Sequence, residues 1–249
     1  MFREIKNKKI LVTGASSGIG AAIAKLFIEH GAVVGLHYLK NKEGAENIQK
    51  SAAKGMAEIF QGDLFEENSR KQLVPEFVRK FGGIDVLINN AGACHEYKHF
   101  SGITEAEWDK MFDLHAKAPF YLTRSAFVHM EKQKWGRIIN ISTIATEHAG
   151  ANNMHYYSSK TAADAFTKGF AKEGVANNIL VNTIRCGVID TPMRTKISGY
   201  DEERFLKRVA MIPLKRAGKP LDIARLVLFL ASECGDFMTG ETFTVAGGE

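Results

Sequence analysis

A tyrosine and a lysine four residues apart, Tyr156 and Lys160, are the side chains of this sequence best placed for acid–base chemistry. They fall in a segment with helical spacing of apolar residues, 154–173, so they share one face of the expected helix. A phenol has a pKa near 10 and is a poor acid–base catalyst at neutral pH, but a neighbouring ammonium group favours the phenolate and lowers that pKa. The pair therefore indicates a phenol tuned for proton transfer; the alternative is an ordinary tyrosine–lysine pair on a solvated helix.

A glycine-rich stretch near the start of the chain, residues 13–20, is a candidate phosphate site. It follows an apolar run at residues 10–12 and opens a segment with helical spacing, so it lies between an expected strand and an expected helix. Glycine permits a tight turn, a close approach of pyrophosphate and close helix–strand packing, and the helix start offers free N–H groups. An ordinary strand–helix connection is the alternative. The residues expected at a dinucleotide phosphate are Gly14, Ser16, Ser17, Gly18, Ile19 and Gly20.

The end of the expected second strand, residues 33–38, bears on the choice of nucleotide. In dinucleotide-binding folds an acidic residue near this point holds the ribose 2′-hydroxyl. Here the sequence runs from Tyr38 to Lys40 and Asn41 without an acid. A carboxylate would repel a 2′-phosphate, so its absence and the presence of Lys40 favour NADP(H). NAD(H) is the alternative if Lys40 is only a solvated loop residue.

Polar residues after the third and fourth expected strands complete the nucleotide site. Asp63, with Leu64 beside it, follows residues 57–61 and could accept a hydrogen bond from an adenine amino group. Asn89, Asn90, Ala91 and Gly92 close the fourth strand, and they put amides and a glycine where a ribose would lie.

Strand and helix patterns alternate along the chain, which predicts an α/β fold with a parallel sheet covered on both faces. We expect strands at 10–12, 33–38, 57–61, 84–89, 137–142, 179–184 and 242–245, and helices at 43–54, 66–81, 105–130, 154–173 and 221–232. Pro75 is expected to kink or break its helix. No repeat or linker divides the chain, so we expect one domain over residues 1–249. An irregular substrate loop or lid is expected at about 190–219.

Composition argues against several other classes of protein. The formal net charge is +5, but no run of five or six basic residues occurs, so we expect no nucleic-acid partner. Residues 1–9 are polar and unlike a signal peptide, and the apolar run at 226–231 is too short to cross a membrane. Three scattered cysteines argue against a disulfide framework. Together these features favour a cytoplasmic protein.

In their order and spacing, the glycine turn, Asp63, residues 89–92 and the pair Tyr156 and Lys160 resemble the short-chain dehydrogenase/reductase family, most of all its 3-oxoacyl-carrier-protein reductase and glucose-dehydrogenase-like branches. The resemblance covers nearly the whole chain. It implies a doubly wound Rossmann fold with seven parallel strands and an NAD(P) cofactor. It also implies a homotetramer or homodimer that forms through the helices at 108–130 and 154–173.

The resemblance also implies roles for individual residues. Tyr156 would protonate the substrate oxygen as hydride reaches the carbonyl carbon. Lys160 would hold the nicotinamide ribose and lower the tyrosine pKa. Thr191 would bind the nicotinamide carboxamide, and Gly187 and Val188 are also expected to bind the cofactor.

The chain departs from the family pattern at four positions. The family's catalytic serine, thirteen residues before the tyrosine, is Thr143, which keeps the hydroxyl but adds a methyl group that narrows the site. His115 replaces the asparagine that in the family holds a water for a proton relay, and histidine can also carry protons. Cys186 replaces the proline that the family usually has before this glycine, Gly187. Ala246 replaces the aspartate that usually stands before the last glycines.

These residues favour an NADP(H)-dependent oxidoreductase that reduces a ketone or 3-oxoacyl group to a secondary alcohol, or runs the reverse reaction. The alternative is a dinucleotide-binding sensor or scaffold without catalysis, which the altered Thr143, His115 and Cys186 would explain. We expect no metal site, because the candidate ligands show no recognised spacing. Those ligands are Cys94, His95, His99, His115, His148 and His155.

Overall fold

The computed structural model describes residues 2–94, 96–149, 152–196 and 200–249. In this part of the chain, seven parallel strands form one sheet in the order β3-β2-β1-β4-β5-β6-β7. The predicted fold is therefore confirmed. The order reverses between β1 and β4, and ligands of such sheets bind beyond the carboxyl ends of the strands at that point. The strands are β1 (Lys9–Val12), β2 (Val33–Tyr38), β3 (Ala57–Gln61), β4 (Val86–Asn89), β5 (Gly136–Thr143), β6 (Ile179–Cys186) and β7 (Thr242–Val245).

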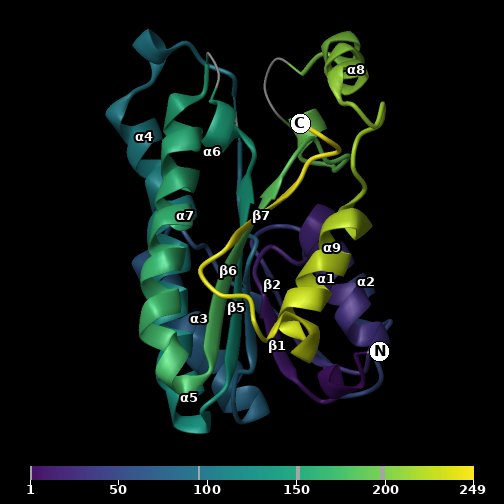
Figure 1. Cartoon of the computed structure of the whole chain (residues 1–249), viewed down its shortest axis with the longest axis vertical. Helices are drawn as coiled ribbons and strands as arrows, with labels where there is room; N and C mark the ends of the chain where they lie inside the picture. Colours follow the sequence, from purple (N-terminus) through teal and green to yellow (C-terminus); the bar gives the residue numbers. More distant parts are fainter. Residues whose placement is uncertain (1, 95, 150–151, 197–199) are drawn as a thin grey trace.

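Helices cover both faces of the sheet (Figure 1). One layer holds α1 (Gly18–Glu29), α2 (Lys42–Gln49) and α9 (Pro220–Ala231), and the other holds α3 (Glu67–Phe81), α5 (Ala118–Gln133) and α7 (Met154–Gly174). Side chains alternate along a strand, so β1 serves both layers: Ile10 and Val12 pack toward α1 and α9, and Leu11 packs toward α3 and α5. The apolar runs of the sequence become central strands because both of their faces are buried.

The helical stretch predicted over residues 105–130 is interrupted by a π-helical turn. It divides into α4 (Glu105–Phe112), the π-helical η3 (Asp113–Lys117) and α5. A capping box between Thr104 and Glu107 starts α4, and Pro119 stands in the first turn of α5, where its missing N–H costs nothing. His115 lies in the π-helical turn and is buried.

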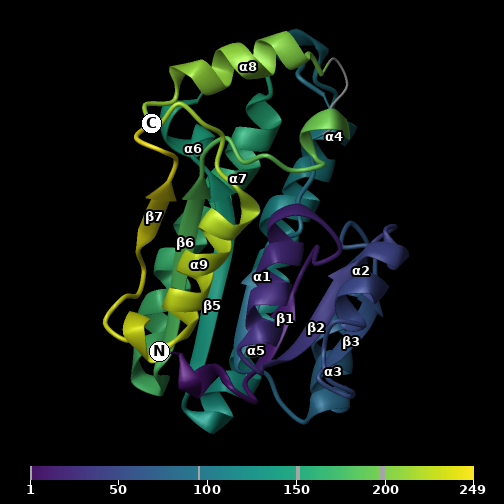
Figure 2. The same ribbon diagram turned by 90° about the vertical axis from the view of Figure 1, so that its right-hand side faces the viewer.

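The region 190–219, predicted to be irregular, contains the short η5 (Arg194–Lys196) and the helix α8 (Glu202–Met211). The prediction was wrong there because the prolines and glycines that suggested irregularity flank α8 and do not interrupt it. Asp201 caps α8 by accepting a hydrogen bond from the Glu203 N–H. Figure 2 shows α8 beyond the carboxyl ends of β6 and β7, on the same side as α4 and α6 (Ala145–His148).

Other boundaries also differ from the prediction. α2 ends at Gln49, short of residue 54, and α3 continues through Pro75 without a break. β5 and β6 each extend one or two residues past their predicted ends, to Thr143 and Cys186. Four further short turns complete the description: η1 (Arg3–Ile5), η2 (Phe100–Gly102), η4 (Val175–Asn177) and η6 (Glu233–Gly235).

Candidate active site

The turn between β1 and α1 has the geometry of a phosphate cradle. Gly14 and Gly18 take positive φ angles of 66° and 55°, which residues with a Cβ rarely adopt. At Gly20 a Cβ would stand 2.3 Å from the Gly14 carbonyl oxygen, so only glycine lets α1 approach β1 this closely. Ser17 precedes α1 without capping it through its side chain, which leaves the N–H groups of the first turn to an anion. These features fit the pyrophosphate of a dinucleotide.

A buried histidine that sequence reasoning missed holds this turn in place. His37, on β2 and 2% exposed, accepts a hydrogen bond at Nδ1 from the Gly14 N–H (3.2 Å). Since Nδ1 accepts, the ring proton is on Nε2, which donates to the Gly62 carbonyl oxygen at 3.0 Å. Burial lowers the pKa of His37 to about 4. The imidazole is therefore neutral over the physiological pH range and connects the glycine turn to the end of β3.

The asparagines after β4 hold the site together from the other side. The Asn90 amide donates to the carbonyl oxygens of Thr13 (2.8 Å) and Gly14 (3.3 Å). The Thr13 hydroxyl accepts the N–H groups of Asn90 and Ala91, each at 2.9 Å. The Asn89 amide turns into the core and donates to the Asn140 side chain. The amide N–H groups of both asparagines thus brace the glycine turn and the core, and their contact with a ribose stays a prediction.

The end of β2 combines structural residues with one exposed cation. Tyr38 is buried and its hydroxyl donates to Gln61. The Asn41 side chain donates to the Ser16 carbonyl oxygen at 3.0 Å and caps α2. Lys40 is exposed, and no carboxylate in the described residues lies within ion-pair distance of it. Of these residues, Lys40 has the charge suited to a 2′-phosphate.

Asp63 and Leu64 follow β3 as predicted. Asp63 Oδ1 accepts the Phe65 N–H at 3.0 Å, so this carboxylate orders the loop that would lie near an adenine. The Leu64 side chain is buried in the core beneath α3. Only the backbone of Leu64 could therefore meet a nucleotide.

On α7, Lys160 is buried and Tyr156 is half-buried, near the carboxyl end of β5. Lys160 is 7% exposed and its Nζ donates to the Ile141 carbonyl oxygen at 2.8 Å. Burial lowers the pKa of Lys160 to about 8. Burial also raises the pKa of Tyr156, and the neighbouring Cys94 and Cys186 thiols add to the shift. This direction is opposite to our expectation, because the protein groups here favour the protonated phenol.

His115 links the loop after β4 to the helix that carries Tyr156. Its Nε2 accepts the Ala93 N–H at 3.1 Å, which places the ring proton on Nδ1. Nδ1 lies 3.1 Å from the Ser159 hydroxyl, which in turn donates to the Tyr156 carbonyl oxygen at 2.8 Å. The imidazole also stands edge-on to the Tyr156 ring, with 5.2 Å between ring centres. The sequence singled out His115 but not Ser159.

Gly92 and Thr143 border the same site. A Cβ on Gly92 would lie 3.4 Å from His115 Nε2 and 3.6 Å from Lys160 Nζ, so its backbone lies against both. Thr143 is half-buried at the end of β5 and pairs in register with Cys186. Its hydroxyl accepts the Ala145 N–H at 3.3 Å. The structure therefore brings the predicted residues of β4, η3, β5 and α7 to one edge of the sheet.

The segment after β6 closes over the glycine turn. Thr191 lies across from Gly18, where a Cβ would come within 3.3 Å of the threonine side chain. At Gly187 a Cβ would stand 2.7 Å from the Ala246 Cα, so close packing of the strand end requires glycine there.

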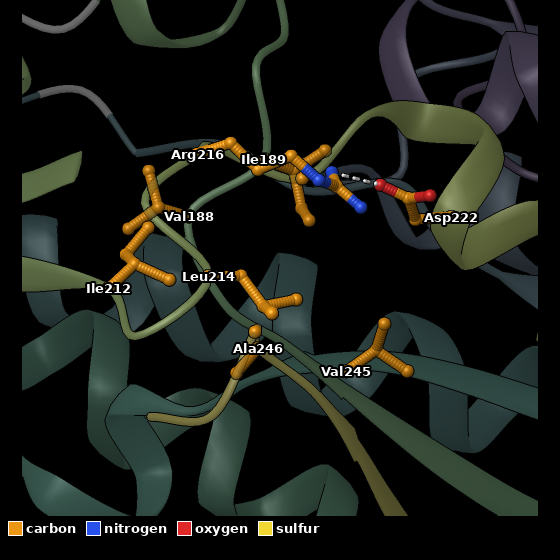
Figure 3. Close-up of a pocket in the computed structure, with 10 residues that line it drawn as sticks. Val188, Ile189, Ile212, Leu214, Arg216, Asp222, Val245 and Ala246 are labelled. Atoms are coloured by element: carbon orange, nitrogen blue, oxygen red, sulfur yellow. Dashed lines mark hydrogen bonds and ion pairs between the residues drawn. The ribbon is translucent and has the colours of Figure 1, made fainter. Parts of the chain in front are cut away.

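A cavity of about 270 Å³ lies beneath this segment, between the residues before α9 and those after β7. Val188 is one of the residues that line the cavity, and the Arg216–Asp222 ion pair lies at its rim (Figure 3).

Among the described residues, no three His, Cys, Asp or Glu side chains are grouped to hold a metal ion. His95, one of the six ligands considered, lies outside the described residues. No helix in the described ranges is both long and apolar enough to cross a bilayer.

Comparisons with known proteins agree with this geometry. A family model described as enoyl-(acyl carrier protein) reductase matches residues 14–249. The chain is 36% identical over 242 residues to the 3-oxoacyl-acyl-carrier-protein reductase FabG of Chlamydia pneumoniae, covering 97% of this chain and 96% of that protein. It is 34% identical over 246 residues to FabG of Thermotoga maritima and 33% identical over 247 residues to nodulation protein G of a Rhizobium species, covering 98% of each chain in both cases. The chain therefore belongs to the short-chain dehydrogenase/reductase family, and it is an oxidoreductase that acts on CH–OH groups with NAD(P).

Proposed function

We propose that this protein uses NADPH to reduce a ketone or 3-oxoacyl group to a secondary alcohol, with Tyr156 as the proton donor. One observation carries the proposal: the half-buried Tyr156 and the buried Lys160 lie at the carboxyl end of β5, beside Gly92 and His115. A sensor without catalysis has no need for a buried lysine beside this tyrosine, because burying an ammonium group costs stability.

The site residues supply a proton and exclude water. When bound, the dihydronicotinamide supplies a hydride, with its electron pair, to the carbonyl carbon. As the C=O π electrons move to oxygen, the Tyr156 phenol gives its proton to that oxygen, and the O–H bond of the phenol breaks. The phenol is protonated at neutral pH, and because burial raises its pKa, transfer of its proton depends on a positive charge that stabilises the phenolate. Lys160, Thr143 and His115 position the tyrosine and the substrate oxygen, and Lys160 stands ready to stabilise the phenolate that remains.

The residues around the glycine turn support NADP(H) as the cofactor. The turn between Gly14 and Gly20 fits the pyrophosphate, and Thr191 lies across from it. Beyond β2, Lys40 is exposed without an acidic partner in the described residues, so its charge is available to a 2′-phosphate. Asp63 lies after β3, on the adenine side. We propose that NAD(H) binds more weakly because it lacks the group that Lys40 would contact.

The names of the relatives support a proposal on the substrate, and exposed side chains on α5 support one on the assembly. Two carry the name 3-oxoacyl-acyl-carrier-protein reductase, and we propose a 3-oxoacyl thioester as the first substrate to test. We also propose one domain over the whole chain and a homo-oligomer. Phe120, Tyr121 and Val128 are exposed apolar side chains on α5, which is one of the helices expected to pair with a second copy.

The test is the oxidation of NADPH and of NADH, followed by absorbance, with acetoacetyl thioester, ethyl acetoacetate and a crotonyl thioester. We expect acetoacetyl turnover with NADPH at a kcat/KM at least tenfold above that with NADH. Turnover of the crotonyl thioester alone would instead favour the enoyl reduction named by the family model. Tight NADPH binding without turnover of any carbonyl would favour the sensor.

A further inference from the structure

The helix α8 carries five charged residues, and four of them have an oppositely charged partner. Glu202 pairs with Arg194, Glu203 with Lys207, and Arg208 with Glu249. Arg204 is the exception: no carboxylate lies within ion-pair distance of it in the described residues, and the residues outside them include no acid. An unpaired guanidinium keeps its full charge for another partner.

Arg204 faces the substrate side of the site. Its guanidinium carbon lies 5.4 Å from the centre of the Tyr97 ring, in the loop after β4. The Arg204 charge also lowers the pKa of Tyr157, although burial raises that pKa overall. Tyr157 in turn contacts Tyr156, with 5.8 Å between ring centres. Tyr97 and Arg204 thus both act on the Tyr157 hydroxyl, and the Tyr157 ring contacts the proposed proton donor.

We infer that Arg204 binds an anionic group of the substrate, a carboxylate or a phosphate ester, while the carbonyl lies at Tyr156. This inference rests on the proposed function and names the substrate class. A guanidinium held against an aromatic ring keeps its edge N–H groups for a carboxylate or phosphate, which it can bind through two hydrogen bonds. The anion has two sources: the acid of a free 3-oxo acid, or the phosphate of the phosphopantetheine arm that carries an acyl thioester.

Two matched pairs of substrates separate these sources. Acetoacetate and ethyl acetoacetate differ in a carboxylate; acetoacetyl-4′-phosphopantetheine and acetoacetyl-N-acetylcysteamine differ in a phosphate. With the unmodified enzyme we expect kcat/KM for the anionic member of one pair to exceed that of the neutral member by about tenfold or more. In Arg204→Gln this preference should fall to about one, through a higher KM of the anionic substrate and not through kcat.

Lys207→Gln is the matched control, because it removes one positive charge from the same helix. Lys207 is 74% exposed and already paired with Glu203, so this variant should keep the preference. A loss of preference in both variants would show a general effect of net charge. A fall in kcat for charged and neutral substrates alike in Arg204→Gln would show that the arginine only holds α8 against Tyr97. Either result overturns the inference.

Calorimetric titration with acetoacetate and with 4′-phosphopantetheine needs no turnover and therefore tests Arg204 separately from the proposed reaction. We expect at least one anion to bind the NADP⁺-loaded enzyme, and to bind about tenfold more weakly to Arg204→Gln. Equal affinity in the two proteins, or no binding of either anion, would overturn the inference even if ketones are reduced. Binding without turnover would instead count against the proposed function alone.

Discussion

Lowering the pH should loosen the glycine turn, because protonated His37 cannot accept the Gly14 N–H. The pKa of His37 falls from 6.5 to about 4 on folding, because burial disfavours the imidazolium. A shift of that size corresponds to about 3 kcal/mol in the free energy of unfolding. Since the folded pKa lies below the unfolded value, this stability is fully present above pH 6.5 and is lost as the pH falls toward 4.

At pH 5 the expected loss from this one residue is about 2 kcal/mol, because the unfolded histidine is protonated there and the folded one is not. Other groups titrate in the same range, so the effect must be isolated by comparison. His37→Gln keeps an acceptor for Gly14 and a donor for Gly62 but cannot titrate. The difference in unfolding free energy between the wild type and this variant should therefore change by about 2 kcal/mol between pH 7 and pH 5.

Urea unfolding followed by circular dichroism at a fixed protein concentration measures this difference. NADPH affinity, measured by fluorescence titration at the same two pH values, should fall more in the wild type than in His37→Gln. His148→Gln removes an exposed histidine and serves as the control. If the unfolding free energies of the wild type and His37→Gln change equally between pH 7 and pH 5, His37 is not the neutral acceptor of the glycine turn.

Three further predictions concern the cofactor site and the link to α7. Lys40→Glu should lower kcat/KM for NADPH relative to NADH by about tenfold, since it places a like charge beside a 2′-phosphate. The control Lys50→Glu, at an exposed residue just after α2, should not change this ratio, and an unchanged ratio in Lys40→Glu would remove Lys40 from the site. His115→Leu leaves the Ala93 N–H and the Ser159 hydroxyl without this partner, so urea unfolding should show a free energy of unfolding lower by about 1–3 kcal/mol. In activity assays, His115→Asn should retain more turnover than His115→Leu. Gly18→Ala strains a positive φ at the start of α1, so NADPH titration should show weaker binding; unchanged affinity would argue against a cradle there.

The fold could be predicted from the sequence because its signals are local. The apolar runs that became β1 and β4 are buried on both faces, and buried parallel strands have this pattern. The four-residue spacing of Tyr156 and Lys160 placed both on one helical face, and the structure puts both at the same edge of the sheet.

What could not be predicted depends on contacts between distant segments. His37 and Gly14 are 23 residues apart, and no local sequence pattern at either residue predicts the hydrogen bond between them. The pKa of Tyr156 follows from its burial, which the sequence pattern does not reveal, and so the predicted direction was wrong. In the sequence, nothing distinguishes Arg204 from the other basic residues near it. Its contact with the Tyr97 ring joins two distant segments and is seen only in the structure.

The measurement that tests the central claim most directly is the turnover of Tyr156→Phe with NADPH and acetoacetyl thioester, alongside its affinity for NADPH. Because the phenol is the proposed proton donor and makes no proposed contact with the phosphates, kcat should fall about 100- to 10,000-fold while the dissociation constant of NADPH changes by no more than about twofold. Undiminished turnover in this variant would contradict the account.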